Sequence, residues 1–235
     1  KIIIIFLSLI FNFTYLNLSL ADEFIFKVTD LEILENNTIY KGNNRGKIIT
    51  DTQVELISDN FEYLKKINRL EANGNVQLTD IKNNVIINAE KMFYLKSEEI
   101  VYTLGKTLIN VDGKYDIEGY DLIFLKNENI LSSEKYTIIT DSEFNKFELD
   151  QFQYSIDREI LKGENIIYIT NDKEDKSDNF FFQSGFFDLQ KNKFLGKDVV
   201  TKYHKTLFGN DDNDPRLISA SAFGDEFNTY FKKGV

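Results

Sequence analysis

The sequence contains no cysteine and no tryptophan, and it has only one proline and one histidine among 235 residues. Without cysteine, the chain has neither disulfide bonds nor a cysteine nucleophile. The single histidine, His204, excludes sites built on several histidines, and no Gly-x-Ser-x-Gly elbow accompanies it. Proline is absent before Pro215, as a long run of paired strands requires, because proline cannot donate to a strand ladder. We therefore expect a strand-rich protein that is not an enzyme and has no cofactor or metal.

The charge balance narrows the class of partner. Acidic residues outnumber basic ones by 38 to 28, which gives a formal net charge of −10 and a pI near 4.8. Binding to nucleic acid needs clustered lysine and arginine, so no nucleic acid is expected. The overall charge gives no attraction to anionic lipid head groups either. We expect partners to bind through apolar contacts.

The first 21 residues are typical of a secretory signal peptide. Lys1 precedes the apolar run from Ile2 to Phe11, and the small residues Ser19 and Ala21 come just before Asp22. A membrane anchor is the competing interpretation, but polar residues interrupt the run after Phe11, and a spanning helix needs about 20 apolar residues. We expect an exported chain beginning at Asp22. Because residue 1 is not methionine, we also expect a fragment of a longer protein.

A repeat of about 30 residues organises the middle of the chain. Its aromatic positions are Tyr63, Tyr94, Phe124 and Tyr154, and the first three are each followed by leucine and lysine. A turn and a short apolar strand follow each aromatic residue, and an acidic residue closes each strand: Asp80, Asp112, Asp141 and Asp172. A regular period of this length indicates one supersecondary unit stacked on its neighbours.

The repeated acids have two interpretations. They could form a calcium ladder, but the glycine-rich nonapeptide of calcium-binding solenoids is missing. Aspartate also commonly ends strands by accepting hydrogen bonds from turn amides. We favour this second role.

The periodicity after Asp22 is that of strands. Apolar and polar residues alternate in segments such as 75–79 and 147–152, and asparagine–glycine clusters such as Asn73-Gly74 predict turns. The segment 61–70 resembles a helical stripe, but its match to the later copies predicts strand, turn and strand. The predicted fold is all-β, an elongated, solenoid-like stack of twisted antiparallel strands.

The number of aromatic residues suggests that the stack has an apolar interior. The chain has 21 phenylalanines and 12 tyrosines, most of which are expected in the core. If two sheets close incompletely over these side chains, an apolar trough remains open along one seam and suits acyl chains. The unpaired strands at its ends could pair with another protein.

Two motifs resemble a known family. The segments Ala72-Asn73-Gly74-Asn75-Val76 and Ala89 to Tyr94 resemble the OstA-like repeat of lipopolysaccharide transport, whereas the later copies 105–107 and 134–136 depart from it. The tail, His204 to Asn210 followed by Asn213 to Leu217, is similar to the segment that joins the periplasmic domain to the barrel in alphaproteobacterial LptD proteins. These are lipopolysaccharide-assembly proteins of the outer membrane.

This resemblance implies a fold, a location and partners. It implies a signal peptide at 1–21, a twisted OstA/LptA-like β-jelly roll over 22–205, and a connector at 206–235 leading to a C-terminal β-barrel outside this sequence. The domain would lie in the periplasm, shield the lipid A acyl chains of lipopolysaccharide and pass them to the barrel. Its implied protein partners are an LptA-like bridge protein, docked strand to strand, and an LptE-like plug lipoprotein that acts through the barrel.

The resemblance also implies which residues line the interior. In the family these are small or apolar strand positions, and a register slip of one residue would invert every assignment. The expected lipid-facing residues are Val76, Leu78, Ile87, Met92, Tyr94, Ile109, Val111, Ile138 and Tyr168.

Two alternatives stay open. A periplasmic LptA-like bridge protein would have the same fold and ligand but no barrel. A structural, adhesin-like β-solenoid would bind no lipid, and it would have a solid interior.

Overall fold

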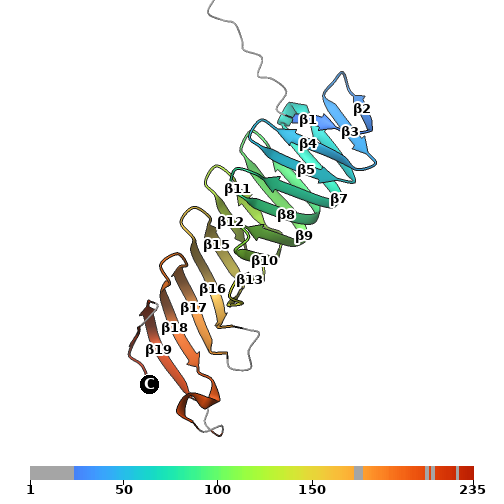
Figure 1. The fold of residues 1–235 in the computed structure, drawn as a ribbon. Helices are drawn as coiled ribbons and strands as arrows, with labels where there is room; N and C mark the ends of the chain where they lie inside the picture. The colour runs from blue at the N-terminus through green and yellow to red at the C-terminus, as the bar shows by residue number, and fades with distance from the viewer. Residues whose placement is uncertain (1–23, 172–176, 210–211, 213–214, 226–227) are drawn as a thin grey trace, which may run out of the picture.

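The computed structural model describes residues 24–171, 177–209, 212, 215–225 and 228–235. The expected signal peptide and Asp172 lie outside these residues. The described chain is an elongated stack of antiparallel strands with two short 3-10 helices, Lys65–Ile67 and Lys205–Phe208, so the all-β prediction is confirmed (Figure 1). None of its described helices has the length and apolar character needed to cross a membrane.

The strand pairings define two leaves that face each other along the stack. The first leaf contains seven short strands: β2 (Asp30–Leu34), β3 (Ile39–Asn43), β6 (Asn60–Leu64), β11 (Ile123–Leu125), β12 (Ile130–Ser133), β15 (Gln151–Ser155) and β20 (Thr229–Lys232). The second leaf contains six: β1 (Phe24–Lys27), β4 (Gly46–Thr50), β5 (Val54–Ser58), β10 (Tyr115–Tyr120), β13 (Thr137–Asp141) and β14 (Lys146–Leu149).

Seven long strands belong to both leaves. They are β7 (Arg69–Asp80), β8 (Val85–Leu95), β9 (Ile100–Val111), β16 (Ile160–Ile169), β17 (Asn179–Asp188), β18 (Lys193–Lys202) and β19 (Arg216–Gly224). One half of β7 pairs with β6 and the other half with β5, and β9 pairs in the same way with β11 and β10. The long strands therefore bend from one leaf into the other.

Glycine permits the bend in two of these strands. In β7 the register with β8 shifts between Asn73 and Val76, and Gly74 between them has a φ of +77°. In β9, Gly105 has a φ of +81°. Only glycine adopts this left-handed region without steric cost. The expected turn at Asn73-Gly74 is therefore a bulge inside a continuous strand, because the same backbone chemistry serves a bend as well as a hairpin.

The repeated aromatic residues form one row on the inner surface of the first leaf. Tyr63, Tyr94, Phe124 and Tyr154 are all buried, and single aliphatic residues on the intervening strands connect them in register. Phe187 continues the row on β17. The segment 61–70, expected as strand, turn and strand, consists of β6, a 3-10 turn and the start of β7.

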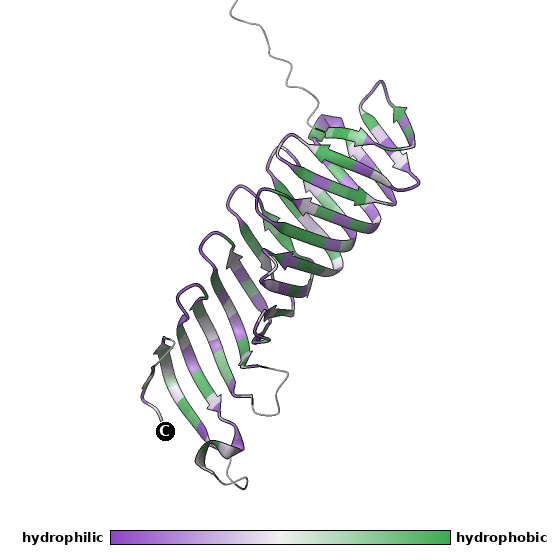
Figure 2. Cartoon of the chain, in the orientation of Figure 1, coloured by the Kyte–Doolittle hydropathy of each residue, from purple (hydrophilic) through white to green (hydrophobic). Residues whose placement is uncertain are grey.

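Hydropathy alternates along the strands as this arrangement requires (Figure 2). In β4 and β5 every second residue is buried. The buried side chains of both leaves belong to one hydrophobic cluster that extends from Phe24 to Ala222. The core therefore runs along the whole described stack.

The segment expected as a connector contains two further strands of the stack. β19 pairs with β18 from Arg216 to Gly224, and β20 pairs with β19. The strand ladder therefore continues past the boundary expected at residue 205. The sequence did not predict these strands, because the segment is rich in residues typical of turns, and the strands lie close between them.

Candidate functional site

The candidate site is the interior between the two leaves, where most of the predicted lipid-facing residues lie. Seven of the nine are at most 3% exposed: Val76, Leu78, Ile87, Met92, Tyr94, Ile109 and Val111. Tyr168 is half-buried against the same cluster. Whether any of them contacts lipid remains a prediction.

Ile138 is the exception. It is only half-buried, whereas the next residue, Ile139, is 2% exposed and belongs to the core. Ile138 pairs with Glu118, and Ile139 pairs with the buried Ile117. The expectation that Ile138 points inward was wrong, and the neighbouring Ile139 points inward instead. The segment Thr137–Thr140 has an isoleucine on each face of the strand, so its sequence does not show which face is buried.

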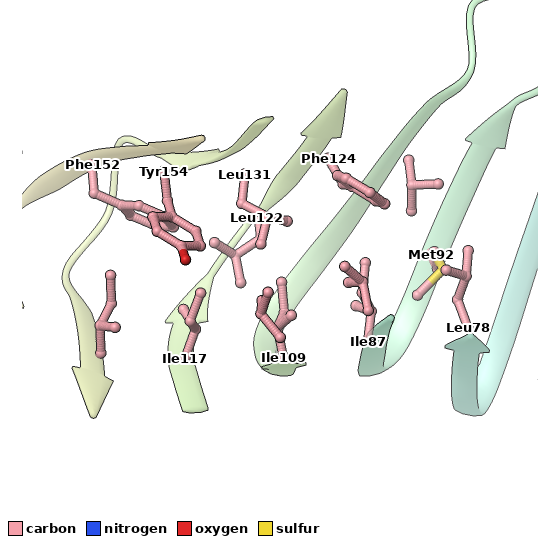
Figure 3. Close-up of a cluster of buried hydrophobic side chains, with 14 of the residues drawn as sticks. Leu78, Ile87, Met92, Ile109, Ile117, Leu122, Phe124, Leu131, Phe152 and Tyr154 are labelled. Carbon is pink, nitrogen blue, oxygen red and sulfur yellow. The ribbon is translucent and has the colours of Figure 1, made fainter. Parts of the chain in front are cut away.

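Side chains from both leaves meet in the middle of the stack. Figure 3 shows Ile87, Ile109 and Ile117 pointing from the second leaf toward Phe124 and Leu131 of the first. The gaps among the inner side chains of β8, β9, β11 and β12 are too small to hold a water molecule. The interior in this region is thus filled by the chain itself, and an apolar guest would enter only if the leaves moved apart.

Toward the C-terminal end the interior becomes aromatic and more open. Phe182 and Phe187 are buried, whereas Tyr168, Phe180 and Phe194 are only half-buried. Their rings form a continuous chain of contacts, with centroids 5.4 Å apart for Phe182–Phe187 and 5.9 Å apart for Tyr168–Phe180. Burial raises the pKa of Tyr168 to about 12, so its hydroxyl stays protonated at neutral pH.

Charged side chains fasten the two leaves together where the interior would otherwise open. Lys96, in the turn after β8, contacts Asp51 of the β4–β5 turn with 3.0 Å between Nζ and Oδ1. Lys126, in the turn after β11, lies 2.8 Å from Glu99 Oε2 and 3.6 Å from Asp80 Oδ2. Lys96 also bonds Glu99. We call these five residues the rim clasp.

The clasp is largely removed from water. The side chains of Lys96 and Lys126 are 6% exposed, and that of Asp80 is fully buried. Burial alone would raise the pKa of Glu99. Hydrogen bonds from Lys126, Lys96 and the Tyr94 hydroxyl outweigh that effect and hold the pKa below its ordinary value. Glu99 is therefore ionised at neutral pH and binds both lysines.

A second cross-leaf contact lies further along the same rim. Glu159, in the β15–β16 turn of the first leaf, accepts from Lys114 Nζ at 2.9 Å and from the Tyr115 hydroxyl at 3.2 Å. Lys114 precedes β10 in the second leaf. This pair is more exposed than the clasp, with Lys114 51% and Glu159 22% exposed. It extends the closed part of the rim as far as β16.

Among the described acids at the strand ends, Asp80 and Asp141 have the turn role that was favoured, whereas Asp112 accepts from the side-chain amide of Asn84. Asp80 accepts from the backbone N–H of Asn83 at 3.1 Å, and Asp141 accepts from the N–H groups of Glu143 and Asn145. His204 also has a local role, because its Nδ1 accepts from the Thr206 N–H at the start of a 3-10 helix.

The sequence analysis did not predict the rim clasp, although the sequence contains a signal for it. Lys96 and Lys126 each stand two residues after a repeated aromatic, in Tyr94-Leu95-Lys96 and Phe124-Leu125-Lys126. A lysine that recurs in register with buried aromatics marks a repeated position beside the core. Lys65 holds the same place in the first copy but is exposed, with Nζ 5.9 Å from the Tyr40 ring centroid.

Both ends of the stack present edge strands. Among the described residues, β1 at the N-terminal end pairs only with β4, and β2 only with β3. Within the same part of the chain, β20 at the C-terminal end pairs only with β19. An unpaired edge offers backbone donors and acceptors to another strand.

Comparison with known proteins adds no relative: no family model matches the chain, and no curated protein matches its sequence.

Proposed function

We propose that the chain is a non-enzymatic lipid conduit that acts in lipopolysaccharide transport and assembly at the outer membrane. The two leaves shield the lipid A acyl chains from the water of the periplasm and pass them toward a barrel. An LptA-like bridge protein docks on an edge strand and delivers the lipid, and an LptE-like lipoprotein works with the barrel.

The observation that carries the proposal is the single apolar interior that runs between the leaves from Phe24 to Ala222. A compact domain buries its core at one centre, whereas this core is drawn out along an axis that ends at edge strands. Acyl chains would bind there by burial alone, worth about 0.8 kcal/mol for each buried methylene. No side chain need change its protonation state.

The rim clasp makes such a conduit able to open. If apolar side chains sealed the rim, opening would expose them to water, at a free-energy cost of about 25 cal/mol for each Å² of apolar surface. The clasp residues are ions, and the hydration that Lys96, Glu99 and Lys126 lose on closing is regained on opening. Because the open state recovers this hydration, parting the leaves costs less than the size of the core suggests.

The aromatic end of the interior is where acyl contacts need the least opening of the leaves. Tyr168, Phe180 and Phe194 already present part of their surface, so a chain can bind there without wide separation of the leaves. We place the fuller burial of the chain between β8 and β16 and its last contacts before the barrel at this end.

One observation favours a second candidate. The middle of the interior is filled by side chains such as Leu78, Ile87 and Leu131, which are at most 1% exposed. A structural β-solenoid that binds no lipid would have such a solid interior. The two candidates differ in whether the leaves move apart in the folded protein.

Labelling of one interior position separates them. The chain has no cysteine, so Met92→Cys introduces a single thiol in the core. A conduit predicts that a maleimide reaches this thiol faster than global unfolding allows, and that lipopolysaccharide slows the reaction. A structural solenoid predicts labelling only at the rate of global unfolding, with no effect of lipid.

The bridge-protein alternative is decided outside this chain. About ten-residue segments of alternating hydropathy encoded after Val235 would indicate a barrel. A stop codon at that point would indicate an LptA-like bridge protein.

A further inference from the structure

The outer surface of the first leaf carries an exposed apolar row over its last four strands. Phe186, Leu195, Phe223 and Tyr230 lie directly opposite one another on β17, β18, β19 and β20. Directly paired residues point to the same side of a sheet. These side chains are 39–56% exposed, and the Phe223 and Tyr230 rings stack with centroids 4.8 Å apart. We call these four residues the outer row.

A groove runs beside the outer row. Its volume is about 830 Å³, and Phe186 and Leu195 form part of its lining together with Ile123 of β11. This groove lies on the outside of the leaf, away from the interior assigned to acyl chains. Most of the other residues that line the groove are polar, so the outer row is an apolar strip beside a polar groove. Nothing in the proposed conduit uses this face.

Charged residues flank the outer row. Lys162 pairs with Phe186, and three other lysines stand two residues from Leu195 or Tyr230 on the same side of their strands. The charged residues of this face over β16–β20, with Asp225 directly after β19, are four lysines and three acids: Lys162, Lys193, Lys197, Lys232, Glu164, Asp188 and Asp225. Their sum is +1, in a chain whose net charge is −10.

The same outer position is covered nearer the N-terminus of the chain. There Phe93 of β8 stacks on Tyr102 of β9 with ring centroids 4.7 Å apart. Lys91 Nζ lies 5.0 Å from the Phe93 centroid, Arg69 lies 5.8 Å from it, and Phe93 is only 9% exposed. Basic side chains thus cover the aromatic rings on this part of the face, whereas the outer row is exposed.

We propose that this face rests on the surface of an anionic lipid bilayer. Exposed aromatic and aliphatic side chains flanked by lysine are the composition of interfacial membrane-binding surfaces. Each lysine near such a surface contributes about 1 kcal/mol of attraction, and aromatic residues favour the level of the head groups. The net charge of −10 opposes this weakly, because charges more than about 8 Å away are screened at physiological ionic strength.

Two other occupants fit less well. A second copy of the chain would bring the same four lysines together, and like charges facing each other are unfavourable. A soluble protein partner needs about 800 Å² on each side. Four aromatic or aliphatic side chains, each about half exposed, supply roughly half of that. A lipid surface imposes no minimum area.

Sedimentation with vesicles tests the proposal on the chain from Asp22, because the apolar run at residues 2–11 would itself bind lipid. We expect the protein to bind vesicles of phosphatidylglycerol and phosphatidylethanolamine, and to bind pure phosphatidylcholine vesicles at least tenfold more weakly. The variant Lys193→Gln/Lys197→Gln/Lys232→Gln should lose about fivefold in partitioning for each lysine. The variant Phe223→Ser/Tyr230→Ser should also lose binding, with secondary structure retained because both side chains are exposed.

Matched controls use residues of similar exposure elsewhere. Lys27→Gln/Lys66→Gln/Lys82→Gln removes the same charge, and Ile33→Ser/Ile67→Ser removes exposed apolar surface at the other end of the stack. Both should bind like the wild type. Equal losses in the controls, or equal binding to anionic and zwitterionic vesicles, would overturn the proposal. A dimer in solution that Phe223→Ser/Tyr230→Ser dissociates would overturn it in favour of a second copy.

Discussion

Lys96 Nζ lies 3.0 Å from Asp51 Oδ1, and this ion pair joins the rim of the first leaf to the rim of the second. Asp51 is 65% exposed and Lys96 is 6% exposed, so the pair spans the boundary between solvent and interior. Behind it, Glu99 and Lys126 continue the charged contacts inward. The rim clasp therefore holds the rims of the two leaves together beside the interior.

Removing the central carboxylate should destabilise the fold strongly. Glu99→Gln leaves Lys96 and Lys126 buried without their shared anion, and breaking a buried ion pair in this way costs about 3–5 kcal/mol. Urea denaturation measures the loss. Glu118→Gln is the control, because its partner Lys106 is 55% exposed and such surface pairs contribute about 1 kcal/mol or less. Equal effects of the two variants would contradict the role of the clasp.

Acid should loosen the clasp. The pKa of Glu99 lies below its ordinary value of 4.5 in the folded chain. A carboxyl group with a lowered pKa stabilises the folded state above its unfolded pKa, and this contribution disappears as the pH falls through the folded pKa. The difference in Tm between the wild type and Glu99→Gln should be constant near neutral pH and shrink below pH 4.5. A difference that persists unchanged in strong acid would disprove the assignment.

A methyl group at Gly196 should disturb the packing at the aromatic end. A Cβ built there would lie 2.1 Å from the Phe182 ring, so the ring must move. Overpacking of this kind costs about 1–3 kcal/mol. Gly196→Ala should therefore lower the stability, and Phe182→Leu should offset part of the loss in the double variant. Additive losses in that double-mutant cycle would show that the two positions do not touch.

The inner and outer faces of β13 can be told apart by truncation. Ile139→Ala removes a buried side chain and should cost about 2–5 kcal/mol. Ile138→Ala should cost clearly less, because that side chain is only half-buried. Chemical denaturation of the two variants checks the register. The reverse order would restore the inward direction first expected for Ile138.

The strand content and the repeat were accessible from the sequence because both are local. Tyr63, Tyr94 and Phe124 recur with the period of one structural unit, and their common row follows from that period. The direction of Val76 and Leu78 could be inferred from the polar residues that alternate with them.

Other features depend on contacts that local pattern does not encode. Asn73-Gly74 has the composition of a hairpin turn, and only the pairing of β7 with both β5 and β6 makes it a bend. Lys126 and Asp80 are 46 positions apart in the sequence, and they approach only because the leaves fold over each other. The outer row likewise depends on the order of β17 to β20, which places four separate apolar residues side by side.

The most direct test of the conduit is site-specific photo-crosslinking to lipopolysaccharide. A photoreactive residue is placed at Leu78 or Ile109 in the interior and at Lys82, an exposed position in the β7–β8 turn, as the control. The conduit predicts strong labelling of lipopolysaccharide from the two interior positions and little from Lys82. Interior labelling no stronger than that from Lys82 would contradict the proposed function.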